Sequence, residues 1–133
     1  MNSIPPTPAT AAIAIIDDEE CVRTALGSLL RSIDVQSELF DCGASFLQHD
    51  PHRFALVFSD IQMPGLSGID LLERIHAIAP TVPVALMTAF PDAEWRERAE
   101  RNGAYRFLVK PLDADAVIDM IEDLLARDST NRF

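Results

Sequence analysis

Five short apolar runs alternate along this chain with stretches that have the character of amphipathic helices. A continuous apolar run is typical of a strand buried on both faces, and apolar residues three or four apart are typical of a helix with one buried side. The apolar runs lie at 11–16, 35–40, 54–59, 83–87 and 105–109. The predicted helices lie at 21–33, 43–49, 69–79, 91–102 and 113–127.

Strands that alternate with helices predict right-handed βαβ units, and therefore a parallel sheet covered by helices on both faces. In such an α/β sheet, ligands bind at the carboxyl ends of the strands, near the point where the strand order reverses. The candidate site residues are therefore those that directly follow each apolar run. They are Asp17 with Asp18, Asp41, Asp60, Thr88 and Lys110.

The chain has 133 residues and a net charge of −10. This length predicts one domain and excludes a two-domain enzyme with separate cofactor and substrate lobes. A surface this negative repels phosphate backbones, so we expect no direct nucleic-acid binding by this chain. The sequence has no apolar run near the roughly 18 residues of a membrane span and no basic segment before its first apolar run. We therefore expect a soluble, cytoplasmic protein without a membrane partner.

The ends of the chain differ from its middle. Residues 1–10 contain three prolines and no charged side chain, which predicts a disordered N-terminal tail. We expect the folded domain to cover 11–127 and a short C-terminal tail to cover 128–133. Because no basic helix-turn-helix segment follows, we expect either a stand-alone domain or the excised front half of a transcription factor.

Three acidic residues are expected to converge at the carboxyl edge of the sheet, namely Asp17, Asp18 and Asp60. Two carboxylates at about 4 Å repel by around 4 kcal/mol at an effective dielectric near 20. Such a cluster needs a cation or raised pKa values, and its oxygen ligands suit Mg²⁺. The alternative is that residues 17–20 are only the acids of a helix N-terminus. That alternative explains Glu19 and Glu20 but leaves Asp60 unexplained.

Lys110 is the one lysine of the chain, since the other ten basic residues are arginines. Its compact ammonium acts as a point charge toward a carboxylate or a phosphoryl oxygen. Thr88 adds a hydroxyl, and the small Ala89 follows it. Three acids, a hydroxyl and an ammonium together describe a Mg²⁺-assisted phosphoryl acceptor, in which a carboxylate attacks and the other groups hold the transferred oxygens.

Four segments carry a resemblance to a known family. They read Ile-Asp-Asp-Glu-Glu at 16–20, Ser-Asp-Ile-Gln-Met-Pro-Gly-Leu-Ser-Gly at 59–68, Met-Thr-Ala at 87–89 and Val-Lys-Pro at 109–111. In this order they resemble the receiver domain of two-component response regulators, and among these the FixJ-like receivers. The resemblance implies a flavodoxin-like (βα)₅ three-layer sandwich of the doubly wound α/β class. Its five parallel strands are expected in the order 2-1-3-4-5.

The resemblance also implies which residues would receive the phosphoryl group and bind the metal. Asp60 matches the phosphorylated aspartate of the family. Asp18 matches the direct ligand of Mg²⁺ (or Mn²⁺), and Asp17 matches its neighbour, which usually acts through water. Gln62 occupies the position whose main-chain carbonyl binds the metal.

Further matches concern the residues that would respond to the bound phosphoryl group. Thr88 and Lys110 match the residues that bind the phosphoryl group, and Phe107 matches the aromatic residue that changes rotamer. The Lys110–Pro111 bond matches a cis peptide bond. Phe90, two residues beyond Thr88, flanks the path of the water that would remove the phosphoryl group. Its ring either covers the site and slows that loss, or points to solvent or toward the fourth helix.

These matches imply a phosphorylation-dependent signalling switch, with a histidine kinase or a phosphotransfer protein as the donor. The output surface would be the face of the fourth helix, fifth strand and fifth helix, where a downstream protein or a second copy of the chain would bind. Trp95 and three arginines of the fourth helix would form part of that face, or else belong to a solvated helix side. The expected chemistry is limited to the protein's own phosphorylation and dephosphorylation, so it would not be an enzyme acting on other substrates.

Other functions on the same type of sheet fit less well. A haloacid-dehalogenase-type phosphatase would have a second acid where Gln62 stands. A flavodoxin-type flavin carrier would have a glycine- and hydroxyl-rich loop where the acids at 17–20 stand, and these acids would repel its phosphate. A receiver-like interaction module that is never phosphorylated remains an alternative, although every matched site residue is present.

Overall fold

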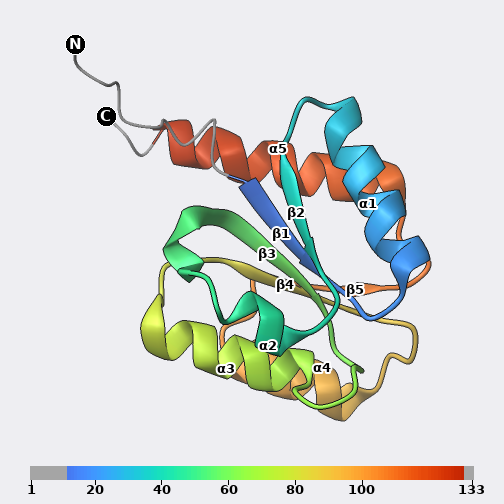
Figure 1. Cartoon of the computed structure of the whole chain (residues 1–133), viewed down its shortest axis with the longest axis vertical. Coiled ribbons are helices and arrows are strands. Elements are labelled where there is room, and N and C mark those ends of the chain that lie inside the picture. Colours follow the sequence, from blue (N-terminus) through green and yellow to red (C-terminus); the bar gives the residue numbers. More distant parts are fainter. Residues whose placement is uncertain (1–11, 131–133) are drawn as a thin grey trace.

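One parallel sheet of five strands forms the centre of the molecule, in the order β2-β1-β3-β4-β5 (Figure 1). This computed structural model describes residues 12–130, with side chains through residue 126. The strands are β1 (Ala12–Ile16), β2 (Ser37–Phe40), β3 (Phe54–Asp60), β4 (Val84–Thr88) and β5 (Arg106–Val109). The predicted doubly wound α/β fold and its strand order are confirmed.

Helices cover both faces of the sheet, as predicted. The α-helices are α1 (Glu20–Ser32), α2 (Gly43–Phe46), α3 (Gly68–Ile78), α4 (Ala93–Arg101) and α5 (Ala114–Thr130). A short 3₁₀ helix, η2 (Pro51–Arg53), which the apolar pattern did not predict, precedes β3. Helices α1 and α5 lie on one side of the sheet, and α2, α3 and α4 lie on the other (Figure 1). Among the described helices, none combines the length and the hydropathy that crossing a membrane requires.

The central strands are buried on both faces, which explains why they read as continuous apolar runs. In β1, Ile13 and Ile15 pack toward α1 and α5, whereas Ala14 and Ile16 pack toward α2, α3 and α4. These four side chains are completely buried. Burying an isoleucine side chain contributes about 1.5–3 kcal/mol, so β1 is a strong anchor for the loop that follows it.

Several element boundaries differ from the sequence-based ones. Strand β2 begins at Ser37 instead of residue 35, because Asp34 has a φ of 61° and the amide of Val35 donates to Leu30 of α1. Helix α2 ends at Phe46 instead of residue 49. Helix α4 begins at Ala93 instead of residue 91, because the side chain of Asp92 caps it.

The predicted tails are also affected. Helix α5 continues to Thr130, three residues beyond the predicted boundary at 127. Residues 128–130 contain no glycine or proline that would end a helix, so the first half of the predicted tail 128–133 is helical. The predicted N-terminal tail, 1–10, and residues 131–133 lie outside the described residues.

Candidate functional site

The carboxyl ends of four strands bring the predicted site residues to one edge of the sheet. Asp60 is the last residue of β3, and Thr88 is the last residue of β4. Asp17 directly follows β1, and Lys110 directly follows β5. The register of β3 against β4 pairs Asp60 with Met87, one residue before Thr88. The prediction that these residues share an edge is confirmed.

The three predicted acids form a cluster. Asp17, Asp18 and Asp60 each offer a carboxylate oxygen, and these oxygens lie within 4.8 Å of one another. Asp17 is fully buried and Asp60 is 4% exposed, whereas Asp18 is open to solvent. A helix N-terminus accounts for acids on α1 but not for Asp60, which comes from β3. This set of hard oxygen donors, open on the Asp18 side, could hold a divalent cation.

Lys110 lies within this acidic cluster. Its Nζ donates a hydrogen bond of 2.8 Å to Oδ2 of Asp17 and lies 3.5 Å from Oδ1 of Asp60 and 3.7 Å from Glu19. Burial alone would lower the pKa of Lys110, but the hydrogen bond to Asp17 and the neighbouring negative charges outweigh it and raise this pKa. The ammonium therefore stays charged and partly neutralises the carboxylates.

Asp60 is the acid on which burial and repulsion have the greatest effect. Burial, followed by the charge of Asp17, raises the pKa of Asp60 from 3.8 to about 6, although Lys110 opposes this rise. The ionised carboxylate of Asp60 is thus disfavoured in the folded protein, and a bound cation would stabilise it. Perturbed acids of this kind are typical of functional sites.

Thr88 forms a small hydrogen-bonded group with Gln62 and Phe90. Its hydroxyl donates to Oε1 of Gln62 at 3.3 Å and accepts from the amide of Phe90 at 3.0 Å. Thr88 itself is buried, whereas Gln62 is exposed. The hydroxyl is thus held by Gln62 and Phe90 and would have to leave Gln62 in order to bind a phosphoryl oxygen.

The ring of Phe90 does not cover the site in this structure. Phe90 is 69% exposed, which corresponds to the solvent-facing alternative from the sequence. The Lys110–Pro111 peptide bond, which directly follows β5, is cis, as expected.

Phe107 lies half-buried on β5, against the core that α3 and α4 cover. The guanidinium of Arg96, on α4, lies over its ring at 4.6 Å from the centroid. Trp95 packs against the same core, and the guanidinium of Arg98 lies 5.5 Å from its ring centroid. The side chain of Trp95 is therefore partly inserted in the fold and is not simply part of a solvated helix face.

The turn after Asp60 requires glycine. The amide of Gly68 donates to the carbonyl of Ile61, and a Cβ at Gly68 would lie 2.3 Å from the carbonyl oxygen of Asp60. Gly65 has a φ of 81°, which glycine adopts readily. Ser67 then caps α3 through the amide of Asp70, at 3.1 Å. The first turn of α3 is thereby held directly against the end of β3.

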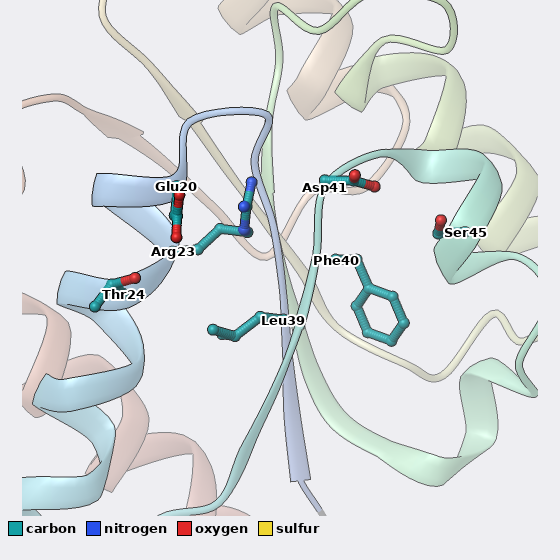
Figure 2. A pocket seen from close by; sticks show the side chains of 7 residues that line it. All are labelled: Glu20, Arg23, Thr24, Leu39, Phe40, Asp41 and Ser45. Carbon is teal, nitrogen blue, oxygen red and sulfur yellow. The ribbon is translucent and has the colours of Figure 1, made fainter.

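Two residues near the site were not identified from the sequence. Glu19, interpreted there as an ordinary first-turn acid, donates its amide to Oδ1 of Asp17 and approaches Lys110. Arg23 extends from α1 toward the end of β1 (Figure 2) and donates to the carbonyl of Asp17 at 2.7 Å. Only the side-chain packing reveals these contacts.

Asp41, by contrast, is one of the candidate residues that follow the apolar runs of the sequence. It lies at the end of β2, points away from α1 and lies outside the acidic cluster (Figure 2).

Comparison with known proteins agrees with this geometry. The family model for the response regulator receiver domain matches residues 13–122. Transcriptional regulatory protein FixJ of Bradyrhizobium diazoefficiens is 39% identical over 114 residues, covering 85% of this chain and 56% of FixJ. Transcriptional regulatory protein ZraR of Escherichia coli O157:H7 is 36% identical over 115 residues, covering 86% of this chain and 26% of ZraR. A receiver domain structure from Clostridium thermocellum matches with a TM-score of 0.82 at 26% identity, covering 90% of this chain and 98% of that one.

The doubly wound sheet, with acids and a lysine at its carboxyl edge, defines a CheY-like α/β domain. The chain belongs to the response regulator receiver domain family, since the family model covers most of its length. The general function of this family is that of a phosphorylation-dependent switch in bacterial two-component signalling. The chain spans about half the length of FixJ and about a quarter of ZraR.

Proposed function

We propose that Asp60 accepts a phosphoryl group from a phosphohistidine of a histidine kinase or phosphotransfer protein. The observation that carries this proposal is the position of Asp60, buried between Asp17 and Lys110 with its pKa raised to about 6. An oxygen of Asp60 attacks the phosphorus, the bond from phosphorus to the donor imidazole breaks, and the imidazole nitrogen keeps the electron pair. The product is an acyl phosphate on Asp60.

The residues that would hold the metal are Asp17, Asp18 and Asp60, together with the main-chain carbonyl of Gln62. The donor set, with its carboxylate oxygens within 4.8 Å, supports Mg²⁺ or Mn²⁺. When bound, the ion neutralises the charge that accumulates on the phosphoryl oxygens. We propose that Lys110 contributes to the same neutralisation, since its ammonium already lies 3.5 Å from Asp60.

Thr88 would detect the phosphoryl group by binding one of its oxygens. Its hydroxyl would leave Gln62 and donate to a phosphoryl oxygen, and the space vacated would admit the ring of Phe107. This movement would reshape the face of α4, β5 and α5, which we propose as the output surface. A downstream protein or a second copy of this chain would bind there. A coupling of about 1–3 kcal/mol is sufficient for such a switch.

The whole protein could carry this switch in two settings. In the first, the domain acts through protein contacts, without direct binding to nucleic acid or membrane and without catalysis beyond its own phosphorylation and dephosphorylation. In the second, it regulates an attached DNA-binding part, which is supported by the partial coverage of the transcriptional regulators FixJ and ZraR. Both settings place the protein in the cytoplasm, where the ATP that supplies histidine kinases is made.

Small-molecule phosphorylation tests the proposal without a known kinase. The protein is incubated with acetyl phosphate, with Mg²⁺ or with excess EDTA, and its intact mass is followed. We expect one phosphoryl group to be added with Mg²⁺ and none with EDTA, and Asp60→Asn to remain unlabelled. Asp41→Asn, which removes an exposed acid at the end of β2, is the matched control and should be labelled as the wild type is. Undiminished labelling of Asp60→Asn would contradict the proposal.

A further inference from the structure

Among the three arginines of α4, Arg96 is the one that meets an aromatic ring of β5. Its guanidinium carbon lies 4.6 Å from the ring centroid of Phe107. Arg98 lies 3.9 Å from a carboxylate of α3, and Arg101 lies 3.4 Å from a carboxylate of its own helix. Arg96 has no ion pair among the side chains described for residues 12–126. Its main side-chain partner is therefore the face of Phe107.

Phe107 and Thr88 lie on the same face of the sheet. The register of β4 against β5 pairs Leu86 with Phe107 and Thr88 with Val109. Alternate residues of a strand point to the same side, so Thr88 and Phe107 are diagonal neighbours across the two strands. That side is the one covered by α4, because Phe107 packs against the core that contains Ala99. Arg96 thus contacts the ring from outside, and Thr88 lies further along the sheet on the same face.

Helix α4 is lightly anchored, so a single contact to β5 matters. Ala99 is its one buried residue, and Trp95 and Arg98 are half-buried. Elements with few buried contacts are those that move in conformational switches. A cation over an aromatic ring at a partly exposed site changes an equilibrium by about two- to fivefold.

We propose that Arg96 is a positioning residue for Phe107, holding the ring in its present half-buried place and so favouring the unphosphorylated arrangement of α4 and β5. The inference rests on the proposed function, in which the ring turns inward as Thr88 moves to the phosphoryl group. That turn removes the ring face from beneath the guanidinium, so the contact with Arg96 opposes it. Neutralising Arg96 then favours the activated arrangement and tightens the binding of a phosphoryl mimic.

Titration with beryllofluoride in saturating Mg²⁺ measures this bias. Trp95, the single tryptophan of the chain, lies on α4 and reports binding by its fluorescence. We expect Arg96→Gln to bind beryllofluoride about two- to fivefold more tightly than the wild type. Arg96→Lys keeps a cation and should bind nearly as the wild type does. Arg101→Gln removes the same charge from another exposed position of α4 and should leave the affinity unchanged.

A double-mutant cycle separates the role of the ring from general effects on α4. In a Phe107→Leu background, Arg96→Gln should produce no further tightening, because the ring on which it acts is absent. Equal affinities of the wild type and Arg96→Gln would overturn the inference, as would an equal tightening in the Phe107→Leu background. If the wild type failed to bind beryllofluoride, or Asp60→Asn bound it equally, the proposed function would fall and this inference with it.

Discussion

The ammonium of Lys110 donates a hydrogen bond of 2.8 Å to the buried carboxylate of Asp17, which lies 93 positions earlier in the chain. The same ammonium lies 3.5 Å from Asp60. Lys110 therefore serves as a counter-ion for carboxylates that would otherwise repel one another. Phosphorylation would offer this ammonium a further anionic partner without moving it far from Asp60.

Removing this counter-ion should destabilise the protein. We expect Lys110→Met to lower the free energy of unfolding in metal-free buffer by about 2–4 kcal/mol, because a largely buried ion pair loses one partner. Saturating Mg²⁺ should recover more stability in Lys110→Met than in the wild type, since the ion replaces the lost positive charge. Urea unfolding followed by circular dichroism measures both effects, with Lys110→Arg as the charge-conserving control. Equal stability of Lys110→Met and the wild type without metal would contradict this view.

Neutralising Asp60 should have the opposite effect at neutral pH. The pKa of Asp60 is about 6 in the folded protein and 3.8 in the unfolded chain, so ionisation favours the unfolded state above pH 3.8. At pH 7 we expect Asp60→Asn to raise the free energy of unfolding by about 2–3 kcal/mol. This advantage should shrink as the pH falls through 6 and vanish below about 3, where the carboxyl is protonated in both states. Denaturant unfolding of both proteins across this range, without metal, measures the difference, and a gain that grew on acidification would be incompatible with a raised pKa.

Asp18 should contribute to metal binding much more than to folding. Its side chain is exposed, and one of its oxygens belongs to the cluster with Asp17 and Asp60. We expect Asp18→Asn to weaken Mg²⁺ binding by roughly tenfold, because the site loses a charged ligand. The free energy of unfolding without metal should change by less than about 0.5 kcal/mol. Calorimetric titration gives the affinity, and Glu20→Gln, a nearby exposed acid outside the cluster, should leave it nearly unchanged.

The close approach of α3 to the end of β3 predicts a severe effect at Gly68. A Cβ there would meet the carbonyl oxygen of Asp60 at 2.3 Å and Cα of Ile61 at 2.9 Å, and both are backbone atoms. We expect Gly68→Ala to lower the free energy of unfolding by about 2 kcal/mol or more and to slow phosphorylation by acetyl phosphate.

Gly27, inside α1, is the matched control for Gly68. A Cβ at Gly27 would make ordinary contacts of 3.5 Å with Leu39 and Ser37, and alanine is a better helix former than glycine. Gly27→Ala should therefore be neutral or slightly stabilising. A Gly68→Ala protein as stable as Gly27→Ala would show that the loop yields more easily than its packing indicates.

The strands and the residues at their ends were predictable because they depend on local pattern. Continuous apolar runs identified β1 and β3, and the topology of a parallel sheet then placed Asp17, Asp60 and Lys110 at one edge. Side-chain pairing was not predictable in the same way. The contact of Arg96 with Phe107 depends on the packing of α4 on β5, and sequence spacing carries no information about it. For the same reason the sequence does not determine the exposure of Phe90, which is 69% exposed in the structure.

The identity of the acceptor residue decides the central claim. An acyl phosphate on an aspartate is reduced by borohydride to homoserine, which marks the residue permanently in a peptide map. After treatment with acetyl phosphate and Mg²⁺, homoserine should appear at position 60 and at no other aspartate, and it should be absent when EDTA replaces Mg²⁺. Homoserine at position 17 or 18, with Asp60 intact, would contradict the assignment of Asp60 as the phosphorylated residue.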